Sequence, residues 1–114
     1  MITRTISSLL VCVIALSAGC TRDERCHMRQ SEARANLFAL NDAQAKFRET
    51  HGRFARSFAE LSFATPDPNY YDVSIEHASA DEYSAKALGK RNVKGDEWTI
   101  NQLGNPVMRT SACP

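Results

Sequence analysis

The segment from Asp23 to about Thr50 limits the fold most, because it contains neither proline nor glycine. It is rich in Ala, Arg, Glu and Gln, which favour a helix. Its mostly apolar residues recur every three or four positions, which places them on one helix face. They are Ala33, Leu37, Leu40, Gln44 and Phe47. A helix over residues 23–50 would be roughly 42 Å long at about 1.5 Å per residue. Because that exceeds the width of a small domain, we predict that its N-terminal end protrudes.

The pattern changes after Gly52, which ends the predicted helix. A short second helix is expected at about residues 58–62, with Ser57 as its N-cap. Two prolines, Pro66 and Pro68, then break the chain. From about residue 70 to 112, apolar and polar residues alternate in short runs, which is typical of β-strands. The alternating apolar sets are Tyr71-Val73-Ile75, Tyr83-Ala85-Ala87 and Trp98-Ile100 with Gln102, and a last run starts at Val107 and Met108.

The links between these runs are too short for parallel crossovers, so the four strands form an antiparallel meander. One apolar face of such a sheet needs cover, and the long helix can supply it. The 114 residues suffice for one small domain. The predicted fold class is therefore α+β, with one long helix packed on a four-stranded antiparallel sheet.

Charge is nearly balanced overall, with 14 Lys and Arg against 13 Asp and Glu. This balance argues against a dedicated nucleic-acid-binding protein. Residues 22–56 carry a net charge of +3 (eight basic, five acidic) and residues 57–114 a net charge of −3 (five basic, eight acidic). Either the two halves complement each other within one subunit, or the basic helix of one copy packs on the acidic sheet of another.

The first 19 residues have the layout of a signal peptide. An uncharged run to Ala18 and Gly19 leads directly to Cys20, as in the lipobox of bacterial lipoproteins. As a helix, residues 5–19 would reach roughly 22 Å, against about 30 Å for a hydrocarbon core. We expect residues 1–19 to be removed and Cys20 to carry acyl chains. Cleavage near Ala18 by ordinary signal peptidase, or an uncleaved anchor, are the alternatives.

Export of the chain determines which chemical state is expected for the remaining cysteines. With Cys12 removed and Cys20 acylated, Cys26 and Cys113 are left as thiols. An even pair in an oxidising compartment suggests a disulfide. Free thiols or pairing between molecules are the alternatives.

Several motifs along the chain resemble the periplasmic part of type IV pilins and pseudopilins. They are RQSEARANL at 29–37, AQ at 43–44, HGRF at 51–54, FAEL at 58–61, and DEWTINQ at 96–102, followed by GN at 104–105 and Cys113. The resemblance covers about residues 28–114 and implies a pilin-like roll. It departs from the family before the helix, where we do not find the pilin cleavage segment and its long apolar continuation. We therefore expect that this chain does not polymerise by the usual route.

Taken together, the resemblance and the lipobox-like sequence before Cys20 predict a non-catalytic pilin-like domain of residues 20–114, held in the bacterial cell envelope by its lipid. Thr21 after the cysteine resembles the outer-membrane default. The expected partners are the membrane and the proteins of a type IV pilus or type II secretion system, with no small-molecule substrate. The alternative is a stand-alone surface or periplasmic lipoprotein that reuses the pilin fold to bind something else.

Residues with catalytic or metal-binding chemistry form no recognisable pattern. His27, His51 and His77 are scattered, and no GxSxG turn occurs. We predict no enzyme activity, no metal and no cofactor. Some pseudopilins hold calcium, but the adjacent carboxylates Asp81-Glu82 and Asp96-Glu97 fit a solvated turn better than a calcium loop. One basic cluster contains Lys86, Lys90, Arg91 and Lys94. It is either a solvated loop or a contact for DNA or another anionic polymer.

Overall fold

The computed structural model describes residues 22–63 and 70–114. The predicted signal peptide, Cys20, and the segment with Pro66 and Pro68 lie outside these residues. The elements in chain order are α2 (Arg22–His51), α3 (Phe58–Leu61), β1 (Tyr71–Ala78), β2 (Tyr83–Gly89), the 3-10 helix η1 (Arg91–Val93), β3 (Glu97–Asn101) and β4 (Val107–Thr110). Each predicted helix and strand is present within one or two residues of its expected bounds.

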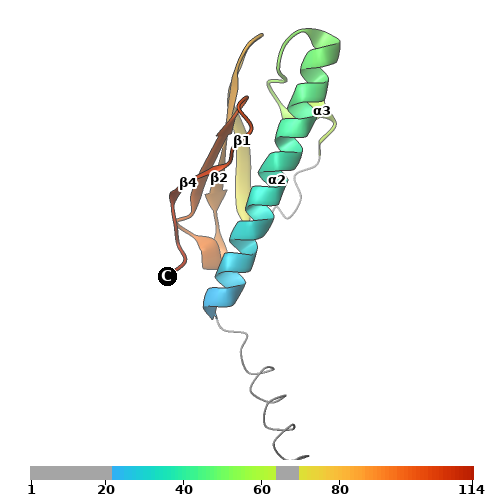
Figure 1. Cartoon of the computed structure of the whole chain (residues 1–114). Coiled ribbons are helices and arrows are strands. Elements are labelled where there is room, and N and C mark those ends of the chain that lie inside the picture. Colours follow the sequence, from blue (N-terminus) through green and yellow to red (C-terminus); the bar gives the residue numbers. More distant parts are fainter. Residues whose placement is uncertain (1–21, 64–69) are drawn as a thin grey trace, which may run out of the picture.

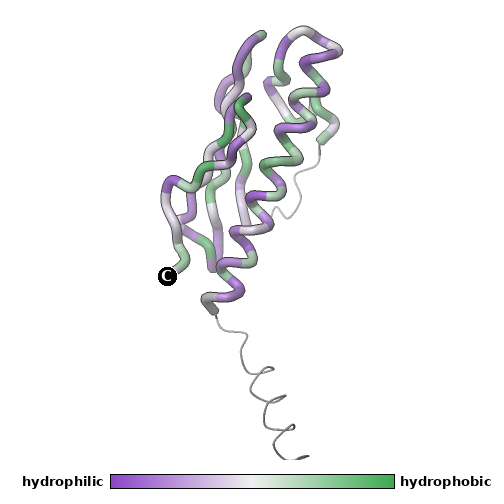
Figure 2. Tube along the Cα trace, viewed as in Figure 1, coloured by the Kyte–Doolittle hydropathy of each residue, from purple (hydrophilic) through white to green (hydrophobic). Residues whose placement is uncertain are grey.

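The four strands form one antiparallel sheet in the order β1-β2-β3-β4. Helix α2 lies along one face of this sheet (Figure 1). The predicted α+β class and the meander topology are therefore confirmed. Hydrophobic and hydrophilic residues alternate along both layers (Figure 2), so each layer has one apolar face.

The core fills the space between α2 and the sheet. From the helix it takes Ala33, Leu37 and Leu40, and from the sheet Tyr71, Tyr83, Ala85, Ala87, Trp98 and Ile100. In β1, β2 and β3 the more buried residues follow the predicted alternation, whereas all four residues of β4 are exposed. Polar Gln44 is fully buried as well, because its side-chain amide exchanges two hydrogen bonds with the main chain of Ala55, at 2.7 and 2.9 Å.

The turns and caps also have local causes. Gly52 adopts a φ of +72° and its amide donates to Arg48 O, which ends α2. Ser57 caps α3 as predicted, because its hydroxyl accepts a hydrogen bond from the amide of Glu60.

Three details of the sequence interpretation were wrong. The beginning of α2 does not protrude from the domain at Cys26 and Gln30, which are only 5% and 6% exposed. The chain end covers these first turns, which pattern analysis of the helix alone does not reveal. Phe47 is half-buried rather than a core residue, and Gln102 is exposed in the turn after β3.

Candidate functional site

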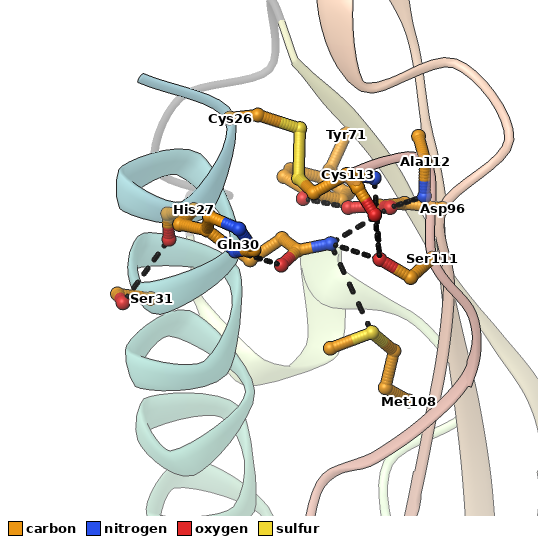
Figure 3. Close-up of a disulfide and its surroundings, with 10 residues drawn as sticks. All are labelled: Cys26, His27, Gln30, Ser31, Tyr71, Asp96, Met108, Ser111, Ala112 and Cys113. Atoms are coloured by element: carbon orange, nitrogen blue, oxygen red, sulfur yellow. Dashed lines mark hydrogen bonds between the residues drawn. A yellow bond between two sulfur atoms is a disulfide. The ribbon is translucent and has the colours of Figure 1, made fainter. Parts of the chain in front are cut away.

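A disulfide joins the beginning of helix α2 to the end of the chain (Figure 3). Cys26 and Cys113 are 87 residues apart in sequence, and their Cα atoms are 5.7 Å apart. Cys26 lies on the buried face of α2, one turn before Gln30. The residues after β4 are thereby fixed against the first turns of the helix.

A buried carboxylate lies beside this disulfide. Asp96, just before β3, is 1% exposed. Its Oδ1 accepts hydrogen bonds from Gln30 Nε2 at 3.0 Å and from the amide of Ala112, and its Oδ2 accepts one from the Tyr71 hydroxyl at 2.6 Å. Three donors from three separate segments thus compensate for the loss of water around the charge. Burial, and next the hydrogen bond to Asp96, raise the pKa of the Tyr71 hydroxyl above its ordinary value.

Gln30 extends this network to the residues after β4. Its Nε2 also donates to Ser111 Oγ at 2.9 Å, and its Oε1 lies 3.3 Å from His27 Nδ1 (Figure 3). We call Cys26, Gln30, Asp96, Ser111, Ala112 and Cys113 the tail cluster. Its donors and acceptors face one another, so it holds the helix, the sheet and the chain end together.

Of the tail cluster, sequence reasoning found only the two cysteines and missed Gln30 and Asp96 as interior residues. For Gln30 a signal existed, since positions 26, 30, 33, 37, 40 and 44 continue the three-and-four spacing of the helix face. Asp96 offered no such signal, because a carboxylate next to Gly95 in a turn is usually solvated.

The four cations of the predicted basic cluster do not form one surface. Lys86 Nζ lies 3.3 Å from Glu97 Oε1 on the sheet face away from α2, and Lys90 Nζ lies 3.0 Å from Asp72 Oδ1. Arg91 and Lys94 are exposed and have no ion pair among the residues that the structure describes. The loop therefore presents two unpaired cations rather than four.

The other end of the molecule carries an open groove of about 530 Å³ between the end of α2 and the turns of the sheet. Arg48 spans it, donating to Ala80 O at 2.9 Å and pairing with Asp81 at 3.3 Å. Asn41 accepts a hydrogen bond from the Tyr83 hydroxyl at 2.6 Å beside it. These groups bind one another and present no nucleophile with a base.

The histidines and the acidic pairs do not converge on one site. His51 stacks on Phe47, and His77 lies 3.5 Å from Glu82. The carboxylates considered for calcium have other partners: Asp81 pairs with Arg48, Glu97 pairs with Lys86, Glu82 contacts His77, and Asp96 belongs to the tail cluster. Within residues 22–63 and 70–114, no group of three or more His, Cys, Asp or Glu side chains is placed to hold a metal ion. The expected absence of a cofactor stays a prediction.

No helix in the described part of the chain has the length and apolar character needed to cross a bilayer. A long helix laid across a four-stranded antiparallel meander, with the chain end fixed near the helix start, defines a pilin-like domain. The profile of the type IV pilin-like G and H family matches residues 30–96. The chain belongs to this type IV pilin-like family, which confirms the resemblance seen in its motifs.

A solved structure agrees with this assignment. The fold is similar to that of the non-core minor pilin PilV of Neisseria meningitidis, with a TM-score of 0.61 and 16% sequence identity. The match covers 78% of this chain and 91% of the PilV chain. At this identity, the likeness concerns the fold. No curated protein is similar enough in sequence to count as a match.

Proposed function

We propose that this chain is a non-catalytic, pilin-like lipoprotein of the bacterial cell envelope, anchored through Cys20. In this role it is a component or accessory of a type IV pilus or a type II secretion system. The observation that carries the proposal is the pilin-like fold of residues 22–63 and 70–114, together with the family match over residues 30–96. The lipobox-like sequence before Cys20 supports the anchor.

A non-catalytic role is supported by how the polar side chains are used. In the described residues, the buried polar side chains Gln30, Gln44 and Asp96 each hydrogen-bond to other parts of the chain. An active site instead needs a nucleophile, a base and an orienting group that converge on a space for substrate. The surface, rather than a pocket, is therefore the part of the molecule that we expect to act.

Replacing the lipidated cysteine tests the anchor. We expect Cys20→Ala to release the protein from membrane fractions, whereas Cys12→Ala, a matched change inside the apolar run, leaves it membrane-bound. A single diacyl or triacyl group is enough for stable attachment. Immunoblots of separated fractions, with the intact mass of the mature protein, provide the measurement. Membrane retention of Cys20→Ala at the level of Cys12→Ala would contradict lipid anchoring.

Crosslinking in cells tests the partner. An affinity-tagged chain should be captured together with the major pilin, or with pseudopilins of a secretion system, after crosslinking of intact cells. Cys26→Ser serves as the comparison, since it removes the disulfide and leaves Cys20 in place. Recovery of the folded, membrane-bound protein without any pilin or pseudopilin would favour the stand-alone lipoprotein.

A further inference from the structure

The loop of residues 90–94 presents two exposed cations on a rigid support. Val93 at its centre is fully buried, and the amides of Gly89 and Lys90 donate to Asp96 O at 2.9 Å and to Tyr70 O at 2.8 Å. Arg91 is held at a φ of +56°, a left-handed conformation that a residue other than glycine keeps only when its surroundings impose it. Binding through Arg91 and Lys94 would therefore cost little backbone entropy.

This loop lies at the same end of the domain as the start of α2 (Figure 1). Asp96, two residues after the loop, accepts a hydrogen bond from Gln30. The Arg29 guanidinium lies 3.9 Å from the ring centre of Tyr70, whose carbonyl accepts a hydrogen bond from the Lys90 amide. The opposite end holds the contact between Arg48 and Asp81. The start of α2, which follows residues 1–21 in sequence, therefore lies at the same end of the domain as the loop of residues 90–94.

The charges at this end leave a positive excess. Arg25, on the first turns of α2, is exposed like Arg91 and Lys94, and Glu24 is the acid beside it. Among the other charged side chains that the structure describes at this end, Arg29 pairs with Glu32 at 3.1 Å and Lys90 pairs with Asp72 at 3.0 Å. Asp96 is buried within the tail cluster and faces no solvent.

We propose that Arg91 and Lys94 dock on anionic phospholipid headgroups and so fix the orientation of the anchored domain on its membrane. This inference rests on the proposed anchoring at Cys20. The loop lies near the level of Gln30 on α2. Gln30 is eight residues from Arg22, so the loop is roughly 12 Å along the helix from the start of α2. Because the Debye length is about 8–10 Å, a modest tilt of the domain brings both side chains into the field of the headgroups.

The energetics favour docking once the chain is anchored. Anchoring turns the contact into an intramolecular event with a high effective concentration of headgroups. A guanidinium also matches the geometry of a phosphate, which it binds through two parallel hydrogen bonds. Two unpaired cations near an anionic surface correspond to about a 30-fold bias toward the docked state.

Hydrogen exchange on vesicles tests this. The mature full-length protein, purified from membranes, is reconstituted into phosphatidylcholine vesicles with or without phosphatidylglycerol, and amide exchange is followed by mass spectrometry. We expect residues 91–95 to exchange more slowly only on vesicles with phosphatidylglycerol. The protection should disappear in about 1 M salt, where the Debye length is about 3 Å.

Variants in which uncharged residues replace the two cations test whether Arg91 and Lys94 cause the protection. Arg91→Asn with Lys94→Ser should lose the protection, and asparagine suits the left-handed conformation at residue 91. Lys46→Ser with Arg56→Ser, which removes two exposed cations far from the loop, is the matched control and should keep it.

The outcomes separate anchoring from docking. Protein that does not float with neutral vesicles contradicts the anchor. Protein that floats, but whose loop exchanges equally on both vesicle types, overturns the docking proposal. Protection of the loop by short duplex DNA, and not by phosphatidylglycerol, would also overturn it and assign the loop to nucleic acid.

Discussion

Asp96 is the single residue on which most of the tail cluster converges. It receives hydrogen bonds from Gln30, Tyr71 and Ala112 while almost completely buried. In Asp96→Asn, an amide NH2 group must face one of these donors, so hydrogen bonds to a charged acceptor are lost and a donor is left without a partner. We expect a loss of about 2–4 kcal/mol in the free energy of unfolding, measured by urea denaturation.

Asp81→Asn is the matched control, because Asp81 is exposed and pairs with Arg48 at the surface. Such pairs contribute about 0–1 kcal/mol. Equal effects of the two substitutions would mean that Asp96 does not hold the cluster together.

The buried hydroxyl of Tyr83 should make the stability of the fold depend on alkaline pH. Its hydroxyl is buried and donates to Asn41 Oδ1, and burial raises its pKa above the ordinary value. The folded protein therefore favours the neutral phenol, whereas an unfolded tyrosine ionises near a pKa of about 10. The free energy of unfolding that this pKa difference contributes is fully present below about pH 10. It is lost as the pH rises further, at up to about 1.4 kcal/mol per pH unit for each such tyrosine.

Tyr71, whose pKa is raised in the same direction, should add to this decline. In urea denaturation between about pH 8 and 12, Tyr83→Phe should lower the steepness of the alkaline decline, whatever stability it loses at neutral pH. An unchanged slope in Tyr83→Phe would show that other groups control alkaline unfolding.

At the scale of elements, the connection from β2 to β3 depends on one glycine. A Cβ atom on Gly89 would lie 1.9 Å from the carbonyl oxygen of Val93, a main-chain atom that cannot move without opening the loop. We expect Gly89→Ala to cost about 3 kcal/mol or more, as severe overpacking does. Thermal unfolding gives the measurement.

Gly52 provides the comparison, since it has a φ of +72° but nothing within 4 Å of the added atom. Gly52→Ala should cost about 1–2 kcal/mol from its left-handed backbone alone. The opposite ranking of the two glycine substitutions would contradict the packing explanation.

Elements with a local cause were predictable from the sequence. The helix face at Ala33, Leu37 and Leu40 and the alternating strands are repeats that neighbouring residues enforce, so their type and bounds were correct. The 3-10 turn η1 and the burial of Asp96 escaped prediction because both depend on contacts with α2, β1 and the chain end. The same limit applies to the basic cluster, where Asp72, far away in sequence, neutralises Lys90.

Across the whole molecule, part of the charge asymmetry is balanced internally. Arg48 pairs with Asp81, and Arg53 pairs with Glu60 at 3.0 Å, so two pairs join the basic first part to the acidic second part. The hydrogen bond from Arg53 lowers the pKa of Glu60. These pairs are exposed and add little stability, but they favour complementation within one subunit over packing between copies.

The disulfide ties the two ends of the domain together covalently. Closing a loop of 87 residues restricts the unfolded chain, which corresponds to about 4–5 kcal/mol in the chain-entropy estimate. We expect Cys113→Ser, Cys26→Ser and the double variant to be destabilised by similar amounts, because each removes the same bond. Urea denaturation of the native protein with reductant should reproduce their midpoints. A native protein insensitive to reductant would contradict this, and a double variant much less stable than either single would show that the cysteines act through packing instead.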